Sequence, residues 1–104
     1  MVYVALSSLI IKTIDGGDNW NYPLLTYEYG FALLEEDETQ SGHLYTAVNS
    51  TVLETEDGGL SWSDLQFPNN SFIGAILYEE ENSALYIGTG FLYYSEPTGV
   101  FVYK

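Results

Sequence analysis

An internal repeat constrains this chain more than any other feature of its sequence. Residues 2–20 align without a gap on residues 44–62, and eight of the nineteen aligned positions are identical. The offset between the two copies is 42 residues. A third copy begins at residue 85, where Leu-Tyr-Ile-Gly stands in place of the Leu-Tyr-Thr-Ala at residue 44. We therefore read the chain as a series of similar units, each about 40 residues long.

Each unit divides into short segments rich in Val, Ile and Tyr, which turn residues separate. The predicted strands are residues 27–34, 43–48, 51–55 and 61–67 in the second unit, and 71–78, 84–89, 91–95 and 100–103 in the third. The first unit starts at residues 2–7, which correspond to a second strand. It therefore lacks the innermost strand of the other units.

The period and the strand content together predict an all-β fold made of β-propeller blades with four antiparallel strands each. The chain would be a single propeller segment over residues 1–104, with about 2.75 blades. The first blade is partial and covers 1–26, the second covers 27–70 and the third 71–104. A closed ring needs about four to eight blades, so oligomerisation or sequence outside this chain would complete it. A β-sandwich is the alternative fold, but it does not explain the repeated turn described next.

Two turns carry the same motif, which reads TIDGGDNW over residues 13–20 and TEDGGLSW over residues 55–62. The motif resembles the Asp-box, Ser/Thr-x-Asp-x-Gly-x-x-Trp, of the Asp-box (BNR-like) repeats in sialidase-like, sortilin-like and photosystem-assembly-factor propellers. A third turn over residues 95–102 keeps the hydroxyl and one Gly but lacks the Asp and the Trp. The residues that carry the resemblance are Thr13, Asp15, Gly16, Gly17, Trp20, Thr55, Asp57, Gly58, Gly59 and Trp62.

The chemistry of this motif is structural. The Asp carboxylate is expected to accept two or more backbone N–H groups, and the Gly pair to allow positive φ. The indole is expected to fill the space beneath the turn. An EF-hand calcium loop needs Gly at its sixth position and Glu at its twelfth. Counted from Asp15, those positions hold Trp20 and Thr26, so we predict no metal site and no cofactor.

The charge balance excludes one class of partner. Fifteen Asp and Glu face only two Lys, which gives a formal net charge of −13. Phosphate backbones are bound by clustered Lys and Arg, so we expect no nucleic-acid binding. No apolar run is long enough for membrane insertion. By the resemblance, the acidic stretches 35–38 and 79–81 lie at the same end as the Asp-box turns. We interpret that end as a solvated face, with a basic partner or weak divalent-cation binding as the alternative.

The opposite end is the possible ligand face. Its candidate residues are Tyr22, Asn49, Ser50, Asn69 and Asn70. Such side chains suit a carbohydrate or protein ligand, but ordinary turns use the same residues. The sequons at Asn49 and Asn69 have meaning only in a eukaryotic secretory pathway.

No catalytic scheme is expected within this chain. It has no Arg for the substrate carboxylate of a sialidase, no Cys, and one histidine, His43, which we interpret as a surface or strand-edge residue. Glu28 and Asp64 are the main carboxylates away from the acidic end. We therefore predict a non-catalytic binding or interaction module, as a homo-oligomer or within a larger assembly. The alternative is a fragment of a larger propeller glycoside hydrolase with its catalytic residues outside the chain. The start of the chain lacks a positively charged signal-peptide region, and an extracellular or virion-associated surface is slightly favoured as location.

Overall fold

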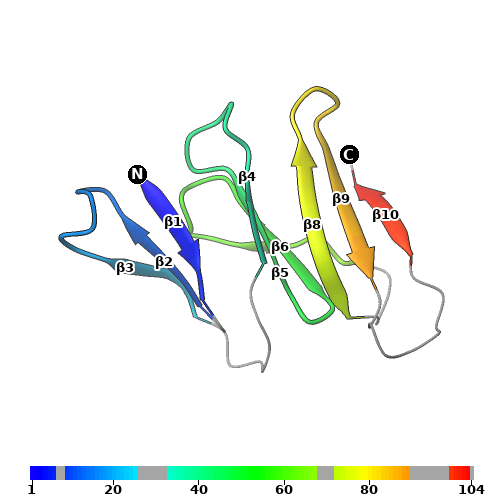
Figure 1. Ribbon diagram of the computed structural model, residues 1–104, viewed down its shortest axis with the longest axis horizontal. Helices are drawn as coiled ribbons and strands as arrows, with labels where there is room; N and C mark the ends of the chain where they lie inside the picture. Colours follow the sequence, from blue (N-terminus) through cyan, green and yellow to red (C-terminus); the bar gives the residue numbers. More distant parts are fainter. Residues whose placement is uncertain (7–8, 26–32, 68–71, 90–98, 104) are drawn as a thin grey trace.

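The computed structural model describes residues 1–6, 9–25, 33–67, 72–89 and 99–103. These residues form ten strands and no helix (Figure 1). The strands are β1 (Val2–Ala5), β2 (Leu9–Thr13), β3 (Asn21–Leu25), β4 (Leu33–Glu36), β5 (Leu44–Val48), β6 (Thr51–Thr55), β7 (Ser63–Asp64), β8 (Ile73–Glu79), β9 (Ala84–Thr89) and β10 (Val100–Tyr103). The predicted all-β class is confirmed.

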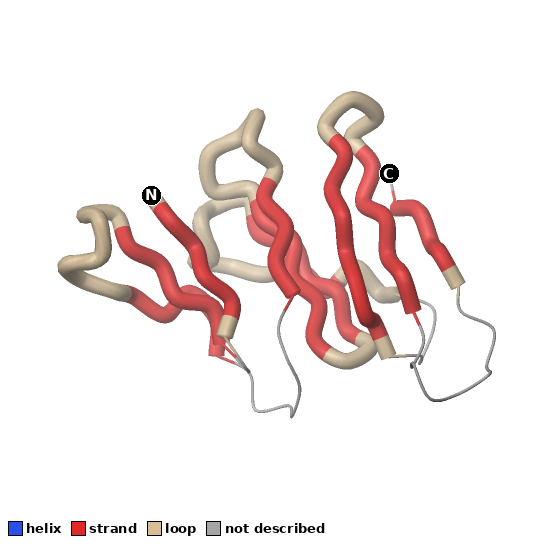
Figure 2. Tube along the Cα trace, in the orientation of Figure 1, coloured by secondary structure: helices blue, strands red, loops and turns tan. Residues whose placement is uncertain are grey.

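The strands form three antiparallel sheets, with the orders β1-β2-β3, β4-β5-β6-β7 and β8-β9-β10. We call them the first, second and third sheet. Figure 2 shows them side by side along the long axis of a molecule that measures 45 × 31 × 20 Å. Strand β4 contacts both β1 and β8, so the second sheet has a neighbour on each side. The three sheets do not close into a ring.

The repeat in the sequence is a repeat in the structure. Strands β1 and β2 occupy the positions of β5 and β6 at the offset of 42 residues. In the second sheet, β5 pairs with β4 on one edge and with β6 on the other. In the first sheet, β1 pairs with β2, and its other edge has no partner strand among the described residues.

The last strand differs from its prediction. We expected residues 100–103 to be a fourth strand, beyond a third strand at residues 91–95. Instead β10 pairs directly with β9, with Val100 opposite Gly88 and Tyr103 opposite Leu85, and so takes the third position. The amide of Thr89 donates to the carbonyl of Gly99 at 2.9 Å and extends this ladder. Residues 91–95 lie outside the described part of the chain.

The fourth strand of the second sheet is shorter than predicted. Residues 61–67 were expected to be strand, but β7 spans only Ser63–Asp64. The backbone turns at Gln66, which has a φ of 57°, and this positive angle ends the extended conformation. Strand β4 runs on to Glu36, beyond the predicted end at residue 34, and most of the predicted strand 27–34 lies outside the described residues.

The core lies between the second and third sheets. Its buried residues are Tyr45, Ala47, Val52, Ile73, Leu85 and Ile87. All five residues of β5 are buried. Successive residues of a strand point to opposite faces of its sheet. Because both sets are buried, β5 must be covered on both faces. The second sheet is therefore the interior layer of the chain.

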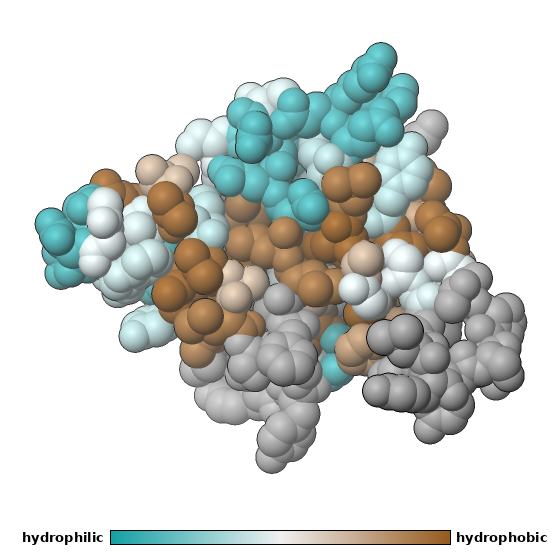
Figure 3. All heavy atoms as spheres, viewed as in Figure 1, coloured by the Kyte–Doolittle hydropathy of each residue, from teal (hydrophilic) through white to brown (hydrophobic). Residues whose placement is uncertain are grey.

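The end of the molecule that holds the β4–β5 and β8–β9 connections is hydrophilic, and hydrophobic residues cross the middle (Figure 3). The amide of Glu38 donates to the carboxylate of Glu80 at 3.1 Å, so the two connections meet. The amide of Gly58 donates to the carbonyl of Gly42 at 3.0 Å, which joins the β4–β5 connection to the turn after β6. The acidic stretches therefore lie at the same end as this turn, as predicted.

Candidate functional site

The Asp15 turn (residues 13–20) is closed by one hydroxyl and one carboxylate. Thr13 Oγ1 accepts the amide of Gly17 at 3.0 Å and donates to Asp15 Oδ1 at 2.8 Å. The Asp15 carboxylate accepts the amide of Asn19 at 2.9 Å and its side-chain Nδ2 at 2.8 Å. We expected the carboxylate to bind the turn amides by itself. Instead, the threonine hydroxyl accepts one turn amide and the carboxylate accepts another.

The Asp57 turn (residues 55–62) repeats this geometry. Thr55 Oγ1 accepts the amide of Gly59 at 2.9 Å and donates to Asp57 Oδ1 at 2.7 Å. The Asp57 carboxylate accepts the amide of Ser61 at 2.9 Å and its hydroxyl at 2.6 Å. Hydrogen bonds from the side chain and the amide of the residue four positions on lower the pKa of Asp15 and of Asp57 to about 2. Both carboxylates therefore have protein donors.

The glycines of both turns adopt the expected positive φ, namely 75°, 100°, 73° and 94° at Gly16, Gly17, Gly58 and Gly59. The tryptophans differ. Trp62 is half-buried, but Trp20 is 39% exposed. Trp20 lies against Gly17, so the ring covers its own turn. It does not fill a buried corner, because the first sheet has a neighbouring sheet on one side only in the described structure.

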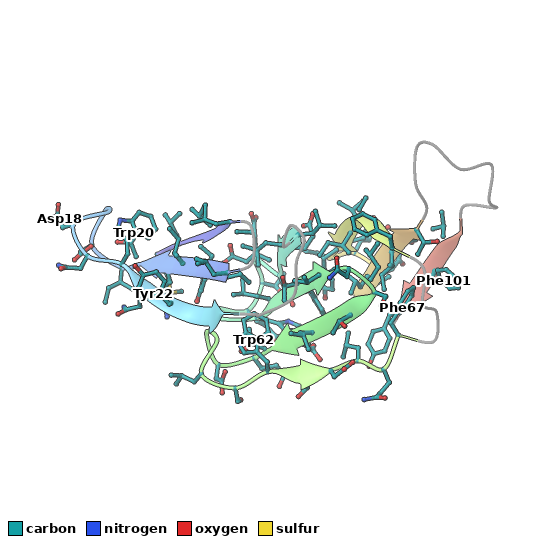
Figure 4. All side chains as sticks on the ribbon, turned by 90° about the horizontal axis from the view of Figure 1, so that it is seen from below. Asp18, Trp20, Tyr22, Trp62, Phe67 and Phe101 are labelled. Carbon is teal, nitrogen blue, oxygen red and sulfur yellow. The ribbon has the colours of Figure 1, made fainter. Side chains whose placement is uncertain are left out.

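The predicted ligand face is not brought together. Asn21 pairs with Lys12, which places Tyr22 at the start of β3, beside the Asp15 turn. Asn49 and Ser50 form the β5–β6 turn at the opposite end of the sheets. In Figure 4, Tyr22 lies with Asp18 and Trp20, far from Phe67. The prediction failed because β3 starts directly after the Asp15 turn, where we had expected residues 21–23 to be a loop. Asn69 and Asn70 lie outside the described residues.

Tyr22 instead borders a pocket of about 460 Å³ between the first sheet and the Asp57 turn, lined by Lys12, Asn21, Tyr22, Gly58, Gly59 and Leu60. A Cβ at Gly58 would lie 3.1 Å from Lys12 Nζ and 3.3 Å from Tyr3 Oη. Lys12 and Tyr3 of the first sheet therefore lie close to Gly58 of the Asp57 turn in the second sheet.

The prediction for His43 was wrong. His43 is only 6% exposed, and both of its ring nitrogens have carboxylate partners. Nδ1 lies 2.8 Å from Asp37 Oδ2, and Nε2 lies 2.6 Å from Glu54 Oε2. Asp37 stands in the β4–β5 connection, His43 directly before β5, and Glu54 on β6. We call these three residues the His43 cluster.

Burial and ion pairing compete in the His43 cluster. Burial disfavours the imidazolium, but the hydrogen bonds and charges of Glu54 and Asp37 outweigh it, so the pKa of His43 is raised. Burial likewise opposes the Asp37 carboxylate, yet hydrogen bonds from Thr39 and His43 lower the pKa of Asp37. Thr39 donates both its amide and its hydroxyl to Asp37, at 3.0 Å and 2.6 Å. Asp37 is therefore held in one orientation.

The cluster also touches the third sheet. The His43 ring lies 4.9 Å from the Tyr45 ring and 6.2 Å from the Tyr78 ring, measured between centroids. Tyr45 and Tyr78 stack on each other at 5.2 Å. The cluster thus stands at the end of the packed surface between the second and third sheets. Its chemistry suits proton or cation binding.

Comparison with models of known protein families, with curated proteins and with solved structures finds no match to this chain. In the described residues we also find no helix that could cross a membrane.

Proposed function

We propose that the chain is a non-catalytic interaction module, a segment of a β-propeller, and that copies of the chain assemble by stacking their outermost sheets. The observation that carries this proposal is that both outermost sheets present apolar outer faces. The second sheet, by contrast, has neighbours on both sides and buries both faces of β5.

The outer face of the third sheet follows from its register. Leu77 and Val102 stand opposite Tyr86 from either side, and Ala75 and Val100 stand opposite Gly88. Cross-strand partners share one face of a sheet. Leu77 is 58% exposed and Val100 is 75% exposed. The alternate residues, such as Ile87, belong to the core instead.

The outer face of the first sheet is apolar in the same way. Ile10 is fully buried, and Tyr3 and Lys12 reach the Asp57 turn, so this set of residues faces the second sheet. The alternate residues therefore face outward. Val2 is 50% exposed, and Val4 and Ile11, which pair with each other, are half-buried. Apolar faces of this kind normally mark an interface.

A second copy of the chain is the occupant that these faces favour. The outer face of the third sheet would meet the outer face of a first sheet, as consecutive sheets meet within the chain. One chain has three sheets, so two copies would have twice that number. This total lies within the range of about four to eight blades that closed propellers have. In the second sheet, β4 pairs with one edge of β5. The corresponding edge of β1 has no partner strand among the described residues, so a strand from outside them is able to pair there.

Light scattering coupled to size exclusion tests this proposal at micromolar concentration. We expect a mass of about 23 kDa, twice the 11.6 kDa of one chain. Leu77→Glu on the outer face of the third sheet should give a folded monomer by circular dichroism. The matched control is Leu60→Glu, which introduces the same charge at a residue 89% exposed in the Asp57 turn and should leave the assembly intact. A monomeric wild-type chain with cooperative unfolding would contradict the proposal, as would equal dissociation in the two variants.

A further inference from the structure

Three side chains near the start of β5 and the end of β6 bring metal-binding atoms together. His43, Glu54 and Glu56 each offer one ligand atom, and these atoms lie within 4.8 Å of one another. Ligand atoms of a tetrahedral zinc site, with bonds of about 2.0–2.2 Å, lie roughly 3.4 Å apart. Because Glu56 is exposed, its side chain is able to move the remaining distance without disturbing the fold. His43, Glu54 and Glu56 are therefore arranged nearly as the ligands of a metal site are.

The imidazole is oriented independently of these two glutamates. Asp37 is 1% exposed and lies 2.8 Å from His43 Nδ1, on the side of the ring away from Glu54. Two hydrogen bonds from Thr39 fix the Asp37 carboxylate in turn. This partner places a proton on Nδ1 and directs Nε2 toward Glu54. Metal-binding histidines are commonly held by such a carboxylate on their other nitrogen.

One proton does not neutralise the negative charge around His43. Asp37, Glu54 and Glu56 carry three formal negative charges around one imidazole. A proton on His43 neutralises one of them, whereas a divalent cation neutralises two. Lys12, the lysine in the described part of the chain, lies over the ring of Tyr3 in the first sheet.

A pocket gives access to the two glutamates. It has a volume of about 370 Å³ and is lined by Glu54, Glu56, Asp57, Ser61 and Ser63. Every residue in this lining is polar, so the pocket suits a hydrated ion. It also leaves room for a water molecule at a fourth coordination position.

We propose that His43 Nε2 and the carboxylates of Glu54 and Glu56 bind one divalent transition-metal ion of the Zn²⁺ class, with Asp37 as a positioning residue. One nitrogen and two carboxylate ligands favour such an ion over Ca²⁺ and Mg²⁺, which prefer oxygen ligands alone. Binding replaces the proton between Nε2 and Glu54, and any proton held there is released to solvent. The ion would link the start of β5 to the end of β6 by coordinating side chains from both. Our prediction of no metal site rested on the EF-hand spacing counted from Asp15 and did not consider His43 as a ligand.

Titration of the full chain with ZnCl₂ after removal of bound metal tests the proposal. His43 is the one histidine in the sequence, so the imidazole resonances in a histidine-optimised NMR spectrum report on this site without assignment. We expect these resonances to shift and to saturate at one equivalent of Zn²⁺. Calorimetry should show at least about ten-fold weaker binding in Glu56→Gln and in Asp37→Asn. Excess Ca²⁺ or Mg²⁺ should not displace the Zn²⁺.

The matched control is Glu81→Gln, which removes the same charge from an exposed position in the β8–β9 connection and should leave the affinity unchanged. Glu56 is exposed, so its variant is expected to keep the fold, which circular dichroism verifies. Imidazole resonances that do not respond to Zn²⁺ would overturn the proposal. Equal losses of affinity in Glu56→Gln and Glu81→Gln would also overturn it, because they would show diffuse attraction to an acidic surface.

Discussion

Replacement of Thr55 by Val tests how the Asp57 turn is held together. Val keeps the branched shape of Thr and its preference for strand, so the change leaves no cavity and removes only the hydroxyl. In the folded chain Thr55 is 2% exposed, and its hydroxyl accepts the amide of Gly59 at 2.9 Å. Gly59 is buried as well, so water cannot replace the lost acceptor.

The expected magnitude follows mainly from that amide, because the exposed Asp57 carboxylate, to which the hydroxyl donates, keeps its two donors at Ser61. A buried donor without an acceptor costs about 1–3 kcal/mol, so Thr55→Val should lower the free energy of unfolding by about that amount. The equivalent change in the first sheet, Thr13→Val, should cost less, about 0.5–1.5 kcal/mol. There the amide that loses its acceptor belongs to Gly17, which is only half-buried and therefore open to water.

Urea unfolding at one fixed protein concentration measures both changes. The matched control is Thr51→Val on the same strand, where the hydroxyl makes no hydrogen bond within the described structure, and we expect a change of less than about 0.5 kcal/mol. Amide exchange supplies a second readout, since the Gly59 amide should exchange faster in Thr55→Val. If Thr55→Val destabilises no more than Thr51→Val, the hydroxyl does not stabilise the turn.

Two further predictions concern the same turns. The pKa of about 2 at Asp15 and Asp57 lies below the ordinary value of 3.8, so these carboxyls stabilise the fold fully above about pH 4 and lose this contribution as the pH falls toward 2. The melting temperature of Asp57→Asn should therefore fall less between pH 4 and pH 2 than that of the wild type. An equal fall would show that the Asp57 carboxylate does not stabilise the fold. Gly16→Ala should lower the free energy of unfolding by about 1 kcal/mol, because φ is 75° there but a Cβ would have open space around it. Gly42→Ala should lower it by more, because φ is 83° and the added Cβ would lie 2.9 Å from the Gly58 nitrogen. Similar losses in urea unfolding would show that the backbone at Gly42 moves freely.

The parts of the fold that local chemistry determines were predictable. Residues 51–55 and 84–89 were predicted as strands with the bounds that β6 and β9 have. The Asp15 and Asp57 turns form as expected because their hydrogen bonds join residues at most four positions apart. Repetition of the motif made these local signals easy to recognise.

The His43 cluster was not predictable in the same way. Its members are 6 and 11 residues from His43, and Glu54 comes within reach only through the register in which it pairs with Tyr45. A strand slipped by one residue would send Glu54 to the other face of the sheet. The placement of Tyr22 failed for a related reason, because it depends on the residue at which β3 begins.

The order of the strands also bears on how the chain folds. In all three sheets each strand pairs with its neighbour in the sequence. The described connections are short, so closing them costs little chain entropy, and each sheet needs only its own contiguous segment to form. A chain leaving the ribosome is therefore able to complete its sheets in order, from the N-terminus onward. Residues far apart in the sequence then come together only when one folded sheet docks on the next. For the same reason, gain or loss of a whole unit during evolution would leave the strand pairing within the other units unchanged.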